Sequence, residues 1–262
     1  IIGFTLLLSF VNISIAEKAP FESSYVPLPS TNTIFRNANI YDGDGNEFNE
    51  TDLLIKDGKI IAIGKDLPGS SDFIEIDATN KWITPGIIDI HSHMGVYSAP
   101  SVSSSSDGNE ATSPVTADVW AEHSIWTQDP QFALALKGGV TTFHVLPGSA
   151  NLIGGRGVTA KNVQRNTINS MKFPNAPHTL KMACGENPKR VYGNRKQAPS
   201  TRMGNIAGYR KAWIDAESYL SRLDEYDSKS DEAKEIGYKP KRDLELETLA
   251  GVLRGEILVH NH

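Results

Sequence analysis

The sequence predicts an α/β protein in which a small β-rich domain precedes a parallel sheet with connecting helices. Between residues 33 and 77, short apolar runs alternate with turn residues, as expected for a domain of short strands. From Trp82 onward, strand-like runs alternate with helix-like stretches, which is typical of a parallel α/β layout. A short apolar run over residues 87–90 follows Pro85-Gly86 and indicates a strand buried on both faces.

The N-terminal segment predicts a secretory signal. Residues 1–11 are mostly apolar, and Ser14-Ile15-Ala16 places small residues where signal peptidase requires them. A transmembrane anchor is the alternative, but the run is shorter than the roughly 20 apolar residues needed to span a bilayer. We therefore expect an incomplete signal peptide (1–16), a Pro- and Ser-rich linker (17–31), and an exported protein, periplasmic or extracellular.

The predicted small domain covers residues 32–82. Its candidate strands are residues 34–41, 52–56, 59–63 and 73–76. Asp57-Gly58 joins the second and third of these strands, and this dipeptide is a strong signal for a two-residue hairpin turn.

The remaining residues, 83–262, contain about five candidate strands separated by helix-like segments. After residues 87–90 the candidate strands are 140–146, 157–163, 179–185 and 256–262. A helical segment is expected over 118–137, with a break near Asp129-Pro130. A second has a buried face at Ile206, Tyr209, Trp213, Ala216, Leu220 and Leu223. Residues 224–243 are charged and predict a solvated excursion, after which Asp243 is placed to cap a last helix.

Composition restricts the partners. The 262 residues have a formal net charge of −5 and no basic stripe, so nucleic acid and anionic membrane are poor candidates and a small-molecule substrate is favoured. Cys184 is the only cysteine, which excludes an internal disulfide. The segment 155–160 matches a dinucleotide-binding glycine pattern, but no acidic residue follows at the required distance, and we reject that interpretation.

The strongest functional signal is the pair His91 and His93 at the end of the apolar run. Side chains alternate along a strand, so the two imidazoles project from the same face. Two neutral imidazoles on one rigid edge can bind a divalent metal, which in turn can activate water near neutral pH. The alternative is a strand that ends in two solvated histidines.

The stretch Pro85-Gly86-Ile87-Ile88-Asp89-Ile90-His91-Ser92-His93 resembles the first-strand signature of the amidohydrolase superfamily. Segments 138–143, 146–151 and 183–190 are also similar to its imidazolonepropionase-like branch. The resemblance extends from about Thr33 to His262. It implies a partial (β/α)8 TIM-type barrel with about five strands present, preceded by part of a small β-sandwich.

Active groups of such barrels lie at the C-terminal ends of the strands. His260 and His262 repeat the His-x-His pattern at the last strand. The resemblance matches His262 to the metal ligand of the fifth strand, and His260 is the alternative. The implied cofactor is a divalent metal, with zinc expected, as one or two ions.

Glu186 follows the strand predicted over 179–185 and is a candidate metal ligand. Otherwise it is a substrate contact or a carboxylate at a helix start. Many superfamily members have a carboxylated lysine at this layer and some have a glutamate. Lys161 and Lys181 are the candidate lysines, although neither convincingly ends a predicted strand.

Four residues are candidate substrate contacts. Lys189 and Arg190 are placed to clamp a substrate carboxylate, unless they form a solvated basic turn. His144 ends the strand over 140–146 and is either a substrate contact or a buried structural histidine. Asn151 lies in a glycine-containing loop that allows a ligand to approach the backbone closely.

The resemblance implies hydrolysis of a carbon–nitrogen bond in an amide, cyclic amide or dipeptide-like substrate by metal-activated water. The superfamily also uses a sixth-strand histidine and a general-base aspartate after the eighth strand, and both are expected beyond His262. Residues 1–262 alone are therefore expected to be inactive. The alternative is an exported, non-catalytic binding or scaffold protein on a degenerate barrel.

Overall fold

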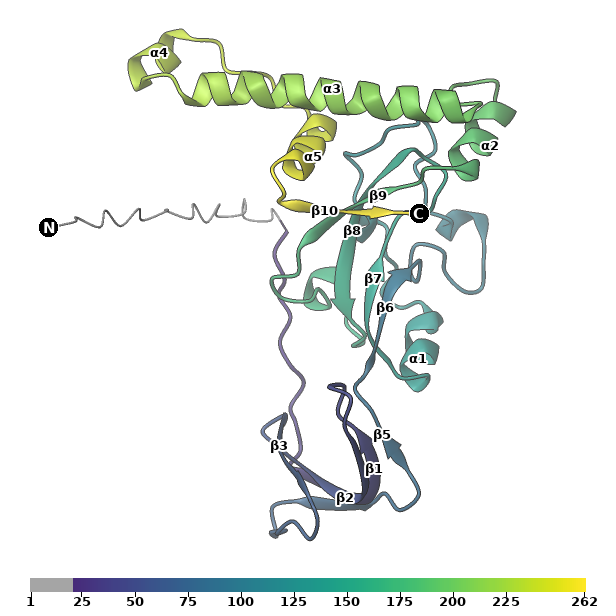
Figure 1. Cartoon of the computed structure of the whole chain (residues 1–262), viewed down its shortest axis with the longest axis vertical. Helices are drawn as coiled ribbons and strands as arrows, with labels where there is room; N and C mark the ends of the chain where they lie inside the picture. The colour runs from purple at the N-terminus through teal and green to yellow at the C-terminus, as the bar shows by residue number, and fades with distance from the viewer. Residues whose placement is uncertain (1–20) are drawn as a thin grey trace, which may run out of the picture.

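The computed structural model describes residues 21–262, which form two five-stranded sheets joined end to end, with helices gathered beside the second sheet (Figure 1). The predicted signal peptide and the first residues of the predicted linker lie outside the described residues. Within 21–262 no helix has both the length and the apolar character needed to cross a membrane.

The first sheet is built from residues 33–83 and has the strand order β3-β2-β1-β4, with β5 pairing β1. Its strands are β1 Thr33–Tyr41, β2 Glu47–Lys56, β3 Lys59–Gly64, β4 Ile74–Asp77 and β5 Trp82–Ile83. The predicted hairpin turn is confirmed, because Asp57 and Gly58 both have positive φ, of 53° and 72°. These residues form a single sheet rather than two packed layers.

The second sheet has the order β10-β9-β8-β7-β6 and curls like part of a barrel wall (Figure 1). Its strands are β6 Ile87–Ser92, β7 Val140–Val145, β8 Ile153–Lys161, β9 His178–Met182 and β10 Ile257–Asn261. The number of strands agrees with the prediction, and the mixed α/β architecture is that of a partial TIM-type barrel.

The direction of β8 departs from the predicted parallel layout. β6 pairs parallel with β7, and β9 with β10, but β8 runs antiparallel to both of its neighbours. A parallel connection needs a crossover of a dozen or more residues. Only residues 146–152 separate β7 from β8, so the chain can only turn back beside β7. This reversal brings the 146–152 connection to the same end of the sheet as the ends of β6, β9 and β10.

Within the described residues, five α-helices accompany the second sheet. They are α1 Pro130–Lys137, α2 Glu186–Asn194, α3 Arg202–Asp227, α4 Asp231–Ile236 and α5 Leu244–Leu253. The predicted cap is confirmed, because the Asp243 carboxylate accepts a hydrogen bond from the backbone N–H of Leu246 at 3.0 Å. The predicted 118–137 helix is reduced to α1 and a single 3-10 turn, because Asp129 caps a new helix start at Pro130.

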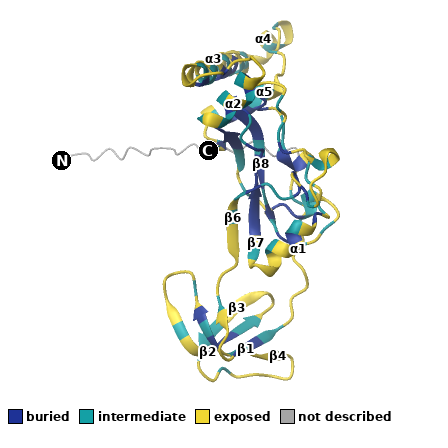
Figure 2. Cartoon of the chain, turned by 90° about the vertical axis from the view of Figure 1, so that its right-hand side faces the viewer, coloured by how far each residue is buried: buried dark blue, intermediate teal, exposed yellow. Residues whose placement is uncertain are grey.

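Burial is uneven across the second sheet (Figure 2). Leu180 and Leu249 are fully buried where α5 covers β9 and β10. By contrast Ile88 and Ile90 of β6 are 63% and 68% exposed. The prediction of a strand buried on both faces is therefore wrong for the described residues, because β6 is an edge strand whose outer face no described element covers. Ile206, predicted on the buried face of α3, is also exposed.

Candidate active site

Four histidines gather at the C-terminal ends of β6 and β10. The ring centroid of His91 lies 5.2 Å from that of His93, 4.9 Å from that of His260 and 5.1 Å from that of His262. The structure therefore brings together both predicted His-x-His pairs from opposite edges of the sheet. His260 and His262 are equally close to His91, so the choice between them stays open at this level.

Lys181 projects into the same cluster from β9, between the two edges. It is fully buried, it is paired in register with His260, and its Nζ lies 3.1 Å from Nε2 of His91. The sequence did not assign Lys181 a convincing strand end because β9 was expected to run to residue 185. The strand instead stops at Met182, which puts Lys181 at its C-terminal end.

Burial suppresses positive charge in this cluster. It lowers the pKa of His91 to about 4, with a further contribution from the neighbouring Lys181 ammonium. Burial also lowers the pKa of His260 and brings the pKa of Lys181 down to about 8. Near neutral pH, His91 and His260 are therefore uncharged bases, and Lys181 loses its proton more readily than an ordinary lysine.

The two outer histidines have their Nδ1 atoms engaged by one loop. Nδ1 of His93 lies 2.8 Å from the carbonyl oxygen of Leu146, and Nδ1 of His262 lies 3.0 Å from Oγ of Ser149. A carbonyl oxygen only accepts, so His93 carries its proton on Nδ1 and has a lone pair on Nε2. This is the tautomer in which an imidazole binds a metal through Nε2.

His144 lies next to the cluster, but both of its ring nitrogens already have hydrogen-bond partners. It is 7% exposed, and its Nδ1 and Nε2 lie 2.9 and 2.8 Å from the hydroxyls of Thr159 and Thr179. Its ring centroid is 6.3 Å from that of His260. Burial lowers its pKa to about 4. Of the two predicted roles, this placement favours the buried structural histidine over a substrate contact.

Glu186 is not among the histidines. It is exposed in the first turn of α2, and its Oε1 accepts a hydrogen bond from Nε of Arg190 at 2.8 Å. The chain has left the sheet at Met182, so a side chain four residues later lies over the helix start, where a carboxylate is favoured by the helix dipole. The placement supports the helix-start alternative and not the metal-ligand prediction. Arg190 and the half-buried Lys189 share this helix surface.

Asn151 is only 1% exposed and its side chain bonds to the long loop that follows β6. Its Nδ2 donates to the carbonyl oxygens of Glu110 and Ser113, at 2.7 and 2.8 Å. This placement does not support the predicted substrate contact. Ser149, two residues earlier, is the residue that reaches the histidines, and sequence reasoning missed it because an isolated serine in a loop has no distinguishing pattern.

The fold agrees with that of a known protein. The chain is 36% identical to an amidohydrolase from Thermotoga maritima MSB8 of known structure, covering 88% of this chain and 57% of that one, with a TM-score of 0.77. It is 35% identical over 229 residues to amidohydrolase tasK of Hapsidospora irregularis, covering 80% of this chain and 23% of tasK. A shorter match, 44% over 63 residues, covers 23% of this chain and 14% of a dihydroorotase from Ligilactobacillus salivarius.

The chain belongs to the amidohydrolase superfamily. No family model matches the sequence. The chain spans less than two thirds of the length of these relatives.

The histidine–lysine cluster of this amidohydrolase fits a divalent metal by its donor chemistry. It combines four imidazoles, two of them with Nδ1 engaged elsewhere, and a lysine amine of lowered pKa. Within residues 21–262, no three side chains of histidine, cysteine, aspartate or glutamate are already arranged so that they could hold one metal ion. Lys181 Nζ instead lies against Nε2 of His91.

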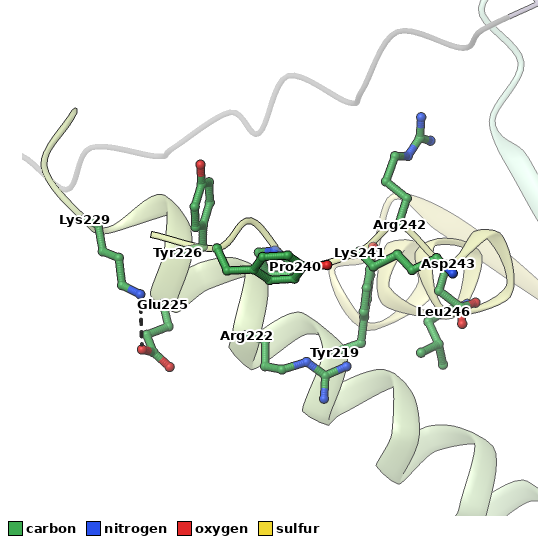
Figure 3. Close-up of a pocket in the computed structure, with 11 residues that line it drawn as sticks. Tyr219, Arg222, Glu225, Tyr226, Lys229, Pro240, Lys241, Arg242, Asp243 and Leu246 are labelled. Carbon is green, nitrogen blue, oxygen red and sulfur yellow. Dashed lines mark hydrogen bonds and ion pairs between the residues drawn. The ribbon is translucent and has the colours of Figure 1, made fainter. Parts of the chain in front are cut away.

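The amidohydrolase chain also has a separate hollow of about 540 Å³ between the C-terminal half of α3 and the segment that returns to α5 (Figure 3). Its lining is mixed, with three tyrosines and both signs of charge, and Glu225 pairs with Lys229 at 3.6 Å. None of the predicted site residues lines it, so we do not assign the hydrolytic site to this hollow.

The histidine pKa values predict loss of stability in acid. The folded-state pKa of His144 is lowered from an ordinary 6.5 to about 4. Below pH 6.5, His144 is therefore protonated in the unfolded chain but stays neutral in the folded chain. The free energy of unfolding falls as the pH drops from 6.5 toward 4. The upper limit for one such group is roughly 3 kcal/mol. Urea unfolding between pH 7 and 4 measures this slope, and His144→Asn is expected to flatten it. An unchanged slope in that variant contradicts the assignment.

Proposed function

We propose that the whole protein is a metal-dependent hydrolase of carbon–nitrogen bonds in amides, cyclic amides or dipeptide-like molecules. The observation that supports this most directly is the buried Lys181 amine 3.1 Å from His91, surrounded by three further histidines at the C-terminal edge of a barrel sheet. Catalytic groups of TIM-type barrels lie at this edge. Membership of the amidohydrolase superfamily supports the same reaction class.

The proposed metal ligands are His91, His93 and His262, with His260 as the alternative to His262. The rings of His93, His260 and His262 are each in contact with the ring of His91. Zinc is the proposed metal, because imidazole nitrogen is among its preferred ligands. When bound, a divalent cation polarises a carbonyl group and lowers the pKa of water to near neutrality.

Lys181 takes the position that the sequence analysis considered for Glu186. We propose that its neutral amine adds to carbon dioxide, forming a carbamate and releasing one proton. The new N–C bond replaces one N–H bond, and the product carries the negative charge and two oxygens that a pair of cations can share. The pKa of about 8 supports this step, because only the deprotonated amine attacks carbon dioxide.

Turnover is proposed for the whole protein. The chain spans 57% of the Thermotoga maritima amidohydrolase and 23% of tasK. From the superfamily resemblance we expect the general-base aspartate after a later strand. Residues 1–262 are proposed to contribute the metal ligands and Lys181. Export through the apolar N-terminal segment is part of the same proposal.

The decisive measurement is the metal content and hydrolytic activity of the full-length protein. We expect stoichiometric zinc by elemental analysis, and release of amine from at least one substrate in a panel of N-acyl amino acids, cyclic amides and dipeptides. Treatment with a chelator is expected to abolish the release, and added zinc to restore it. A purified protein that holds no metal and binds these amides without turnover instead supports the exported binding protein.

A further inference from the structure

One loop contacts both outer histidines of the cluster. The connection between β7 and β8 supplies the Leu146 carbonyl to Nδ1 of His93 at 2.8 Å and the Ser149 hydroxyl to Nδ1 of His262 at 3.0 Å. The two histidines come from β6 and from the end of β10, on opposite edges of the sheet. The loop therefore spans the open end of the sheet and sets the orientation of both rings.

The loop is held from both ends by bonds that do not involve the histidines. Leu146 is fully buried and its N–H donates to Ser92 at 3.0 Å. The N–H of Gly148 donates to Gly108 at 2.7 Å, and the N–H of Ala150 donates to Oδ1 of Asn109 at 2.9 Å. Ser149 thus lies between two anchored backbone positions, which hold the backbone that carries its hydroxyl.

The approach of the two loops depends on glycine at position 148. A Cβ on Gly148 would lie 2.0 Å from Nδ2 of Asn109, so only a residue without a side chain allows Asn109 to bond with Ala150 at this distance. The Asn109 amide also donates to the hydroxyl of Tyr97, whose ring lies 5.8 Å from that of His93. Asn109 therefore links Tyr97, which contacts His93, to the backbone beside Ser149.

We propose that Ser149 is a positioning residue that prepares His262 to bind metal. The 3.0 Å contact fixes the ring plane, and when the hydroxyl accepts the Nδ1–H of His262, Nε2 of that ring has the lone pair that a metal needs. Bonds of this kind to a metal-binding histidine typically contribute 10- to 100-fold in metal affinity. The inference rests on the proposed function, because it assigns the role of His262 in that site, and it selects His262 over His260, for which no comparable bond is present among the described residues.

The test is cobalt binding by the purified full-length protein and its variants. Cobalt(II) replaces zinc at such sites, its visible absorption reports coordination geometry, and the dissociation constant follows from competition with a chromophoric chelator. Ser149→Ala is expected to weaken cobalt binding about 10- to 100-fold and to change the absorption bands. Ser149→Thr, which keeps the hydroxyl, is expected to restore both. Thermal unfolding of each variant without metal establishes that it is folded.

Ser101→Ala is the matched control, because Ser101 is an exposed serine in the long loop that follows β6. It is expected to leave the affinity and the spectrum unchanged. If a folded Ser149→Ala binds cobalt as tightly as the unsubstituted chain and with the same spectrum, the positioning role is contradicted while the proposed function stands. If the unsubstituted chain binds no cobalt, the proposed metal site itself fails.

Discussion

Replacing Lys181 with methionine is expected to lower hydrolysis by the full-length protein at least about 1000-fold and to reduce its metal content, without loss of stability. The loss follows because methionine forms no carbamate, and Lewis-acid stabilisation is worth several kcal/mol at about 1.4 kcal/mol per factor of ten. Elemental analysis and initial rates, measured on the same preparation, check both effects.

The stability of this variant separates a functional lysine from a structural one. Lys181 is fully buried, and burial lowers its pKa from 10.5 to about 8. Between pH 8 and 10.5 the lysine is protonated in the unfolded chain and neutral in the folded chain. The lysine therefore lowers the free energy of unfolding at neutral pH, and this penalty disappears as the pH rises through that range. A buried methionine of similar length avoids the penalty, and the melting temperature is expected to stay equal or to rise.

Lys161 provides the matched control. It was the other candidate lysine in the sequence, and its Nζ lies 4.6 Å from the centre of the Phe173 ring rather than near the histidines. Lys161→Met is expected to retain the metal content and the rate. Retention of full metal content and full rate by Lys181→Met would show that the buried amine is not part of the site.

Replacing Gly155 with alanine is expected to destabilise the chain by about 3 kcal/mol or more, which combines positive-φ strain with overpacking. Gly155 has φ of +106°, and a Cβ there would lie 2.4 Å from the carbonyl oxygen of Val119. That carbonyl accepts the N–H of Arg156 at 2.8 Å, so the backbone cannot move away without losing a bond. Gly155 is also paired in register with Lys181, so a shift of the backbone at Gly155 is expected to move β9 and with it the lysine. Urea unfolding measures the effect.

Gly45→Ala isolates the steric part of this effect. Gly45 has a similar φ of +94°, but a Cβ there would have no neighbour within 4 Å. It is expected to cost about 1–2 kcal/mol, from the positive φ alone. Equal destabilisation by both substitutions would mean that the contact with Val119 contributes nothing.

Much of the site could be predicted because its signals are local. The His-x-His pattern at the end of an apolar run places His91 and His93 on one face whatever the rest of the chain does, since strand geometry repeats every two residues. The same reasoning applies to His260 and His262. The cap at Asp243 and the hairpin at Asp57-Gly58 were also predictable, because a cap or a tight turn depends on a few adjacent residues.

Lys181 and Glu186 show where local reasoning ends. Lys181 lies inside the predicted strand 179–185 and Glu186 follows it. The choice between them depended on where β9 stops, which pairing with β8 and β10 decides. The predicted strand end at residue 185 favoured the carboxylate. The structure places the lysine among the histidines and the glutamate on the surface of α2, because the chain turns out of the sheet after Met182.

The amino-acid pattern alone established the superfamily, the mixed α/β architecture and the histidines that meet at one edge, because these depend on motifs and on periodicity within single elements. Only the tertiary structure could show that β8 runs antiparallel to its neighbours, that Lys181 joins the histidines and that Ser149 contacts His262. These features join residues up to 113 positions apart in the chain. Such contacts are set by how strands pair and how loops pack, and no short stretch of sequence encodes them.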